Sequence, residues 1–459
     1  MTPESFDAII IGAGQAGPPL AERCSKAGLK TALIERGAFG GTCVNVGCTP
    51  TKTMVASARA IHLARRGAEF GFSAGAIQVD MARIKARKDQ IVQQSSQGVE
   101  KWVRGLDTTE VIVGEALFTA PHTLRVGERV LSAPRIFLNV GARSVRPKIP
   151  GVDDVATLDN VSIMDLATVP QHLLIIGGSY IGLEFAQMMR RFGAGVTVVE
   201  KSTRFLSRED EDVAIGIRTI LEGDGVRFVL GADDLALSQQ DGHITLSATA
   251  HGQAQTLVGS HVLLAIGRQP NTDGLHLDAA GIDTDEHGFI TVDEQCRTSA
   301  PGVWAVGDCN GRGAFTHTAY NDHEIVAANL FDDDARRISD RVSCYALFTD
   351  PPLGRIGLNE DQVRQSGQPA LMAQMPMQRV SRAREMGETQ GFMKVLVSAA
   401  SGQLLGASIL GHNGDEVVHA LLGLMVAKQP FSVMARAMHI HPTVSELLPT
   451  LLHQLKPLK

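Results

Sequence analysis

The sequence predicts an α/β protein with two parallel-sheet domains of one plan, followed by a C-terminal α+β domain. Two stretches, residues 7–36 and 172–201, each run from an apolar strand through a glycine-rich turn and a helix into a second strand. Two later apolar strands, within 262–271 and 303–310, are typical of a chain that returns to a sheet already formed. Residues 61–135 are expected to form a long helical segment followed by short β-hairpins such as TLRVGERVLSA. From about residue 340, β-rich segments alternate with helices such as DEVVHALLGLMVAKQ, which is apolar around most of its circumference. A chain of 459 residues is long enough for roughly three such domains.

The first stretch, DAIIIGAGQAGPPLAERCSKAGLKTALIER, has the pattern of a dinucleotide-binding unit. Its glycines permit a tight turn and let the backbone approach a pyrophosphate, whose charge is stabilised by the N-terminus of the following helix. The double proline fits in a first helical turn, where a missing N–H has no intrahelical partner to lose. Glu35 follows the last glycine by 18 residues, where a carboxylate accepts hydrogen bonds from ribose hydroxyls. The glycines are Gly12, Gly14 and Gly17.

The second stretch, HLLIIGGSYIGLEFAQMMRRFGAGVTVVEK, repeats this plan. Its acidic residue, Glu200, again lies 18 residues after the last glycine. Ser179 replaces the middle glycine, which weakens the pattern slightly. The glycines are Gly177, Gly178 and Gly182. Two glycine fingerprints with matching strands and acidic spacing predict two nested Rossmann-like domains with two dinucleotide sites.

The net charge and the apolar content of the chain limit the kinds of partner that we expect it to bind. The formal net charge of −6 disfavours nucleic acid as the main partner, because phosphate binding needs a concentrated basic surface. No apolar run approaches the ~18 residues that a membrane span needs, and the N-terminus enters a strand pattern at Phe6 without a basic leader. We therefore expect a cytoplasmic protein.

The segment GGTCVNVGCTPTK carries the only close pair among six cysteines, Cys43 and Cys48, ahead of a helix expected near Pro50. In a reducing compartment such a pair is typical of a redox-active or metal-binding site. A helix N-terminus stabilises thiolate, the reacting form of cysteine. Two buried, reduced cysteines are the alternative. The adjacent dinucleotide fingerprint favours redox chemistry.

Together, GGTCVNVGCTPTK, the two fingerprints, GRQPN, AVGDCN and MHIHPTVSELLP resemble the FAD-dependent pyridine nucleotide–disulfide oxidoreductases. This family includes dihydrolipoamide dehydrogenase, glutathione reductase and mercuric reductase, and the resemblance covers essentially the whole chain. It implies an FAD-binding domain in residues 1–147, an NAD(P)-binding domain in 148–271, a return segment to the FAD domain in 272–338 and a dimerisation domain in 339–459. An obligate homodimer is also implied.

The resemblance implies a role for each motif. Cys48 is expected against the isoalloxazine ring as the charge-transfer thiolate, and Cys43 as the interchange thiol that meets the substrate. Lys52 is expected near flavin N5, paired with Glu184; two exposed helix charges are the alternative. Asp308 is expected to bind the ribityl–phosphate region of FAD. The remaining implied cofactor-binding residues are Gly12, Gly14, Gly17, Glu35, Thr42, Gly141, Ala142, Gly177, Gly178, Gly182, Glu200 and Gly267.

Two features bear on the nicotinamide nucleotide. Tyr180 falls where the glutathione reductase branch has a tyrosine over the nicotinamide pocket, although it could equally be an aromatic residue that packs at a helix start. Glu200 favours NADH, because its charge repels a 2′-phosphate. The nearby basic residues Lys201, Arg204 and Arg208 could instead hold that phosphate.

The C-terminal motif HPTVSE matches the acid–base dyad of the lipoamide and glutathione branches. The resemblance implies that His441 reaches the interchange thiol of the other subunit and protonates the departing thiolate, while Glu446 orients the imidazole. His439 is expected to be an ordinary histidine.

These features predict a flavoprotein that passes electrons from NAD(P)H through FAD to a Cys43–Cys48 disulfide and on to a small disulfide. A reductase of Hg²⁺ or Cu²⁺ is an alternative, opposed by the C-terminal sequence LLHQLKPLK, which lacks the vicinal cysteines of mercuric reductases. A flavin-bearing redox sensor without turnover is a second alternative, opposed by the His441–Glu446 dyad. The sequence assigns no resident metal site.

Overall fold

The computed structural model describes residues 2–458, which form two compact units. The first contains the chain up to residue 54 together with residues 82–146 and 267–341. The second contains residues 55–81, 147–266 and the chain from 342 onward. Within residues 2–458, none of the helices combines the length and apolar character that crossing a bilayer requires.

A five-stranded parallel sheet forms the centre of the first unit. All but one of its strands are almost uninterrupted runs of buried residues, as expected for a parallel sheet covered on both faces, and the edge strand Thr109–Val113 is partly exposed. The predicted return strand, β19, joins this sheet at its edge beside β8. In spatial order the strands are β19 (Val303–Ala305), β8 (Ile136–Leu138), β2 (Ala8–Ile11), β3 (Thr31–Glu35) and β4 (Thr109–Val113).

Helices α1 (Gly17–Lys26) and α7 (Thr316–Phe331) contact each other in this unit. The proline pair lies in the first turn of α1, as predicted.

The prediction of one continuous helix from residue 61 is wrong. Helix α3 (Cys48–Arg65) ends, a 3₁₀ turn at Gly67–Phe70 follows, and α4 (Met81–Arg104) begins only after a non-helical stretch. Gly71, with φ +82°, ends the 3₁₀ turn in a conformation that no helix can continue.

Two smaller sheets complete the first unit. The expected hairpin in TLRVGERVLSA is present, with β6 (Thr123–Val126) paired to β7 (Arg129–Ser132). These strands lie between β1 (Glu4–Ser5) and β5 (Ala116–Ala120). Strands β9 (Ala142–Ser144) and β18 (Arg268–Pro270) form an antiparallel pair.

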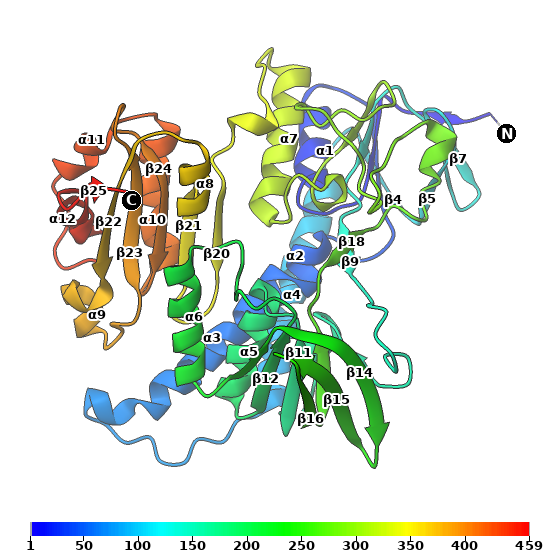
Figure 1. Cartoon of the computed structure of the whole chain (residues 1–459). Coiled ribbons are helices and arrows are strands. Elements are labelled where there is room, and N and C mark those ends of the chain that lie inside the picture. The colour runs from blue at the N-terminus through cyan, green and yellow to red at the C-terminus, as the bar shows by residue number, and fades with distance from the viewer. Residues whose placement is uncertain (1, 459) are drawn as a thin grey trace. The chain divides into compact units, whose positions relative to one another are not determined.

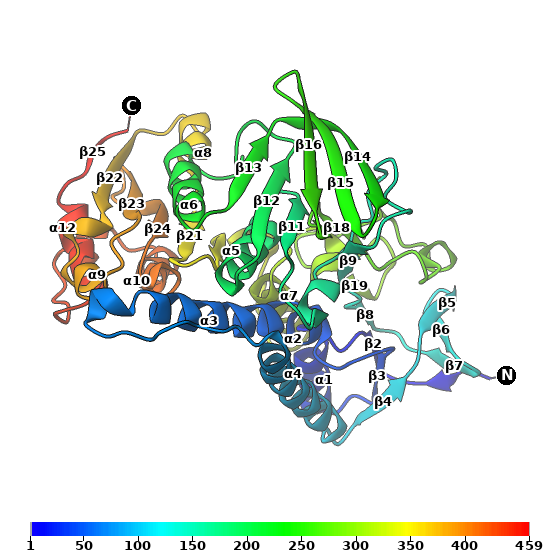
Figure 2. The ribbon, with the colours of Figure 1, turned by 90° about the horizontal axis from the view of Figure 1, so that it is seen from below.

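The second unit repeats the parallel plan. Figure 2 shows β11 (His172–Ile176), β12 (Gly195–Glu200) and β13 (Arg227–Leu230) side by side, with α5 (Tyr180–Phe192) packed on them. The other predicted return strand, β17 (His261–Leu264), pairs with β11, and β10 (Thr157–Leu158) lies beyond it. A separate antiparallel sheet follows along the chain, made of β14 (Ala232–Gln240), β15 (His243–Ala250) and β16 (Gln253–Gly259).

The C-terminal part of the second unit is α+β, as predicted. Its six-stranded antiparallel sheet has the order β20 (Cys344–Leu347), β21 (Leu353–Gly357), β24 (Leu404–Leu410), β23 (Phe392–Ser398), β22 (Ala370–Pro376) and β25 (Lys456–Pro457). Helix α10 (Gly414–Val426) contacts β21 and β24 (Figure 1). The apolar helix expected near residue 415 therefore buries one face, including Leu421, in the core, while Val426 on the other side is 64% exposed.

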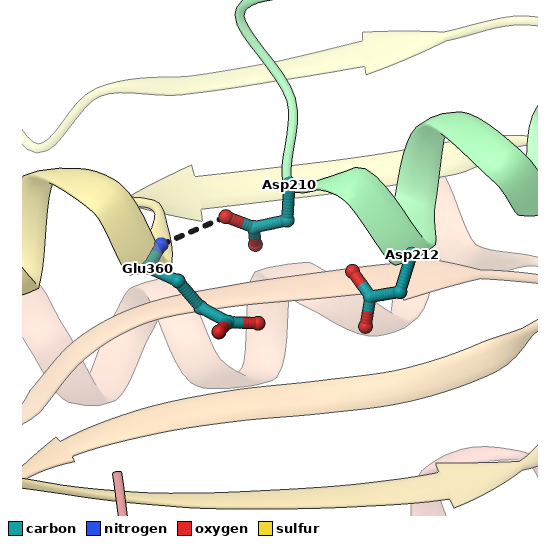
Figure 3. A group of neighbouring side chains, drawn as sticks. All are labelled: Asp210, Asp212 and Glu360. Atoms are coloured by element: carbon teal, nitrogen blue, oxygen red, sulfur yellow. Dashed lines mark hydrogen bonds between the residues drawn. The ribbon is translucent and has the colours of Figure 1, made fainter. Parts of the chain in front are cut away.

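An ion cluster joins the starts of two helices to this sheet. Asp210 and Asp212 lie at the start of α6 (Glu211–Gly223), and Glu360 begins α8 (Glu360–Gln365) (Figure 3). These carboxylates converge as in a metal site. However, Nζ of Lys394, on β23, lies 2.8, 2.6 and 2.6 Å from Asp210, Asp212 and Glu360. The ammonium group thus takes the position that a metal ion would need.

Candidate functional site

The first glycine turn, between β2 and α1, leaves an open backbone cradle. Gly12 has φ +103°, and a Cβ atom there would lie 2.2 Å from the carbonyl oxygen of Asn139. A Cβ atom on Gly17 would lie 2.1 Å from the carbonyl oxygen of Gly12. No side chain caps the N-terminus of α1. The positive end of the helix dipole suits a pyrophosphate, and the glycines let it come close to the backbone, so the turn fits the ADP half of FAD.

Glu35 is fixed at the end of β3. One carboxylate oxygen accepts a hydrogen bond from the N–H of Ala13 at 2.7 Å, and the other accepts from the N–H of Gly37 at 2.8 Å. The acidic residue therefore contacts the glycine turn itself, and its bonds to ribose hydroxyls stay a prediction.

Asp308 follows β19 in the loop GDCN. Burial raises the pKa of its carboxyl group, although Arg268, whose guanidinium lies 3.5 Å away, opposes this effect. Arg268 also donates to the carbonyl oxygen of Ala142 at 2.5 Å, and Val145 N–H donates to the carbonyl oxygen of Gly267 at 3.1 Å. The predicted residues Gly141, Ala142, Gly267 and Asp308 thus belong to one region of the first unit.

Asp322, on α7, is a residue that sequence reasoning missed. Its side chain is 2% exposed, and one carboxylate oxygen accepts from the N–H of Gly307 at 2.7 Å and from the Asn310 amide at 2.9 Å. The other oxygen accepts from Arg341. Asp322 therefore holds both ends of the loop that carries Asp308.

The two cysteines lie where two helices meet. Cys43 is in α2 (Gly41–Val46), beside Thr42, and Cys48 is the first residue of α3, so the helix expected near Pro50 begins two residues earlier. Gly47 permits this sharp junction, because a Cβ atom there would lie 2.8 Å from the carbonyl oxygen of Thr42. Both cysteines are thiols, the reduced form of the couple.

The two sulfurs differ in their surroundings. The hydrogen bond with Cys48 raises the pKa of Cys43 well above its usual range, and burial and the charge of Cys48 act in the same direction. Sγ of Cys48, which is exposed, lies 3.2 Å from the hydroxyl of Thr316 at the start of α7. No role for Thr316 was predicted from the sequence.

Lys52 and Glu184 belong to different units. Lys52 lies on α3, one turn after Cys48, and is partly buried. Glu184 lies on α5, is 6% exposed and accepts a hydrogen bond from the N–H of Phe348 at 3.0 Å. Glu184 is thus not an exposed helix charge, and its pairing with Lys52 stays a prediction.

The second glycine turn, between β11 and α5, repeats the first. Gly177 has φ +109°, and a Cβ atom there would lie 2.4 Å from the carbonyl oxygen of Ala265. A Cβ atom on Gly182 would lie 2.2 Å from the carbonyl oxygen of Gly177. Glu200 accepts from the N–H of Gly178 at 2.6 Å. The two dinucleotide turns therefore share one backbone design, with the acidic residue bonded to the turn in each.

The basic residues after Glu200 differ in the acceptors that their side chains contact. The guanidinium of Arg204 donates to the backbone carbonyl of Glu209 and to Asp361, each at 3.1 Å. Nζ of Lys201 lies 3.9 Å from Asp233 at an exposed position, and Arg208 is exposed.

Tyr180, the first residue of α5, belongs to an arrangement that the sequence did not reveal. The hydroxyls of Tyr180 and Tyr345 both donate to the same oxygen of Glu209, each at 2.6 Å. Glu209 is fully buried, and Tyr345 lies on β20.

The predicted dyad is formed. Nδ1 of His441 lies 2.8 Å from a carboxylate oxygen of Glu446, and the imidazole is 74% exposed while Glu446 is 14% exposed. Met438 and Ile440 nearby are 100% and 80% exposed. The exposed imidazole with a fixed Nδ1 leaves Nε2 available to another group. Nδ1 of His439 contacts only a backbone carbonyl, that of Ala437, among the described residues.

Residues 6–322 match the family described as pyridine nucleotide-disulphide oxidoreductase, and residues 343–452 match the dimerisation domain of the same family. The chain belongs to this family. The family assignment confirms the predicted fold class and a flavin-dependent enzyme that uses a pyridine nucleotide, and the dimerisation domain supports a homodimer.

Three relatives place the chain within the family. It is 36% identical over 451 residues to a probable pyridine nucleotide-disulfide oxidoreductase, RclA of Escherichia coli, covering 96% of this chain and 98% of the relative. It is 32% identical to dihydrolipoyl dehydrogenase of Geobacillus stearothermophilus, covering 96% and 94%. It is also 32% identical to mercuric reductase of Staphylococcus aureus, covering 90% and 76%.

A solved structure described as the Cu(II) complex of HOCl-induced flavoprotein disulfide reductase RclA from Escherichia coli has a TM-score of 0.90 and 35% identity, covering 98% of this chain and 99% of that chain. The predicted activity, a flavoprotein disulfide oxidoreductase, is thereby confirmed at the level of reaction class.

Proposed function

We propose that this enzyme uses NADH to reduce small disulfides through the Cys43–Cys48 couple. When bound, FAD supplies the step from a hydride donor to a dithiol, which side chains alone cannot perform. The observation that carries the proposal is the position of Cys48 at the first residue of an 18-residue helix, with the thiol of Cys43 and the hydroxyl of Thr316 as partners.

The surroundings of the two sulfurs support different roles. The N-terminus of α3 and the hydroxyl of Thr316 stabilise a negative charge on Cys48. The raised pKa of Cys43 keeps that sulfur protonated while Cys48 carries the charge. We therefore assign the resting thiolate to Cys48, and the thiol that attacks the acceptor to Cys43.

The thiol–disulfide exchange with an acceptor can be assigned step by step to Cys43, Cys48 and His441. A base takes the proton of Cys43, whose sulfur attacks one sulfur of the acceptor, and the other sulfur leaves as a thiolate that receives a proton. The thiolate of Cys48 then attacks the sulfur of Cys43 and closes the Cys43–Cys48 disulfide, and the second acceptor sulfur leaves as a thiolate that takes a proton from solvent. We assign the two proton transfers of the first step to Nε2 of His441, with Glu446 fixing the imidazole through Nδ1.

Several contacts support binding of FAD by the first unit. The open turn at Gly12, Gly14 and Gly17 fits a pyrophosphate, and Glu35 lies beside it. The half-buried Asp308, in a loop held by Asp322, supplies a carboxylate beside Arg268. The other residues assigned to this site are Thr42, Lys52, Gly141, Ala142 and Gly267.

The second turn supports NADH as the nucleotide. Glu200 is fixed by the N–H groups of Gly178 and Ser202, so its charge stays where an adenosine ribose binds. Arg204 is engaged by Glu209 and Asp361 and is less available to a 2′-phosphate.

Reduction of Cu²⁺ is a second candidate. The observation in its favour is the match along nearly the whole chain to a reductase solved as a Cu(II) complex. A pair of thiolates is a soft ligand set that suits copper in its lower oxidation state.

An anaerobic acceptor panel tests the proposal. The FAD-loaded enzyme receives NADH or NADPH and then lipoamide, glutathione disulfide, Hg²⁺ or Cu²⁺, and nucleotide oxidation is followed. We expect sustained turnover with NADH and a disulfide. Sustained turnover with Cu²⁺ alone would support the second candidate, and a single reduction without turnover would support a sensor and contradict both.

A further inference from the structure

The hydroxyls of two tyrosines from distant parts of the chain meet on one buried carboxylate in the second unit. Tyr180 and Tyr345 each donate to Oε1 of Glu209 at 2.6 Å, and their rings lie 5.6 Å apart at a tilt of 33°. Hydrogen bonds this short are typical of an ionised acceptor. We call these three residues the tyrosine latch.

The other oxygen of Glu209, Oε2, accepts no hydrogen bond among the described residues but faces a buried arginine. Nε of Arg355, which is 2% exposed, lies 3.7 Å from Oε2 of Glu209, and Arg355 also donates to Ser408 at 2.6 Å. The backbone carbonyl of Glu209 accepts from Arg204. The carboxylate of Glu209 is thus the common acceptor that positions both phenol groups.

The latch lies at the edge of the sheet where the nucleotide turn is. Tyr180 is the first residue of α5, directly after the turn at Gly177 and Gly178, and the Cα–Cβ bonds of a helix tilt toward its N-terminus. Nucleotides bind outside the carboxyl ends of the strands in such sheets. Glu209 lies on the segment between β12 and α6 that begins with Glu200, the proposed ribose-binding residue.

Because the hydroxyls of Tyr180 and Tyr345 donate to the same oxygen of Glu209, one of them can leave while the other still donates to that oxygen. If Tyr180 turns away, Oε1 of Glu209 keeps the hydrogen bond from Tyr345 and Oε2 keeps the ion pair with Arg355, so the buried carboxylate is not left without a partner. Without Tyr345, the departure of Tyr180 would leave Oε1 without a donor among the groups described.

We propose that Glu209 and Tyr345 are positioning residues for the nucleotide site: they hold Tyr180 in a closed position that the nucleotide must release, and Tyr345 lowers the cost of that release. This inference rests on the proposed function in placing a nicotinamide nucleotide at the second turn. A ligand that binds only the released state has an apparent affinity reduced by the fraction of molecules in that state. The strength of the hydrogen bond from Tyr180 to Glu209 therefore contributes to the apparent Kd for the nucleotide.

The two tyrosine variants have effects of opposite sign. In Tyr180→Phe the ring remains but the bond to Glu209 is lost, so we expect the apparent Kd for NADH to fall about tenfold. In Tyr345→Phe the remaining Tyr180 is the sole phenol on Glu209, so we expect the Kd to rise. Tyr320→Phe is the matched control, because Tyr320 is the third tyrosine of the chain and lies exposed in the first unit.

Two measurements on FAD-loaded enzyme decide the question. Stopped-flow reduction by NADH gives the apparent Kd and the limiting rate, and calorimetric titration with NAD⁺ gives binding without turnover. We expect the shifts in Kd in both, with the limiting rate unchanged. Shifts of the same sign in Tyr180→Phe and Tyr345→Phe, or no shift in either, would overturn the latch.

A failure of the proposed function would give other results in these two measurements than a failure of the latch. If the wild type binds NAD⁺ but NADH does not reduce it, the proposed function fails, while opposite shifts in calorimetry still support the latch. Absence of NAD⁺ binding to the wild type would refute both. Glu209→Gln serves as a third variant, with a lowered Kd expected because a neutral amide holds both phenols more weakly.

Discussion

We expect Cys48 to owe its reactivity to its place at the first position of α3. The helix N-terminus and the hydroxyl of Thr316 favour a thiolate at this position, whereas the pKa of Cys43 is raised by its hydrogen bond with Cys48 and by burial. At the residue scale, the two sulfurs of one short motif are therefore unequal before any substrate binds.

Replacement of each cysteine separates the two roles. In Cys48→Ser we expect the long-wavelength charge-transfer absorbance that follows two-electron reduction of the FAD-loaded enzyme to disappear, because the thiolate partner of the flavin is gone. In Cys43→Ser, the matched control, no disulfide can form and Cys48 stays reduced, so the absorbance should already be present in the oxidised FAD-loaded variant before any reductant is added. A long-wavelength absorbance in oxidised Cys48→Ser and none in oxidised Cys43→Ser would reverse the assignment.

His441 acts on protons and not on hydride in our proposal. His441→Gln should slow disulfide turnover by about 10²–10⁴-fold, the range for loss of a general acid–base group, and leave flavin reduction by NADH unchanged. Rapid-reaction measurement of the two half-reactions checks this expectation. His439→Gln is the control and should behave as wild type; equal slowing of both half-reactions in His441→Gln would refute the role.

Some of these residues could be predicted from the sequence and others could not. Glycines, acidic residues and cysteines at fixed spacing belong to local motifs, so Glu35 and Glu200 are found beside their turns as expected. Thr316 is 268 residues from Cys48, and Tyr345 is 136 from Glu209. Such pairs are created by the fold, and no local pattern in one sequence announces them.

At the scale of elements, the ion cluster around Lys394 joins α6 and α8 to β23. Burial alone lowers the pKa of Lys394, but hydrogen bonds to Asp210, Asp212 and Glu360 outweigh burial, so the pKa is raised. A raised lysine pKa contributes stability that is fully present below the unfolded value of about 10.4 and is lost as pH rises through the folded pKa. The cluster is therefore fully formed at neutral pH.

Removal of the ammonium group tests this cluster. Lys394→Met leaves three carboxylates facing one another, and loss of one partner of a buried ion pair costs about 3–5 kcal/mol. Urea unfolding at pH 7 should show this loss. Lys101→Met, at an exposed position of α4, is the control. A variant as stable as wild type at pH 7 would contradict the account.

Element boundaries were predicted less well than element types. Both strand–turn–helix–strand units and both return strands are present, because apolar runs and glycines mark them directly. The break between α3 and α4 was missed, since the basic residues around it resemble the solvated face of a helix, whereas Gly71 and Gly75 both take positive φ values that interrupt a helix.

At the scale of the whole molecule, the dyad and the dithiol raise the question of how many chains make one site. His441 is 74% exposed, and the exposed side chains of Met438 and Ile440 beside it are apolar. Because exposed apolar groups of this kind are typical of interaction surfaces, and because residues 343–452 match the dimerisation domain, we expect this imidazole to serve the partner subunit.

Mixed dimers test whether each site takes its dithiol from one subunit and its dyad from the other. Cys48→Ser and His441→Gln homodimers should both be inactive in disulfide reduction. In a mixed dimer, one site combines the intact cysteines of the His441→Gln chain with the intact dyad of the Cys48→Ser chain. Random reassortment should thus restore about a quarter of wild-type activity, since half of the dimers are mixed and each has one complete site of two. Purification through two different affinity tags raises the recovered activity to about half of wild type on the same reasoning. Mixed dimers without activity would show that each subunit completes its own site, because no chain in the mixture carries both intact parts.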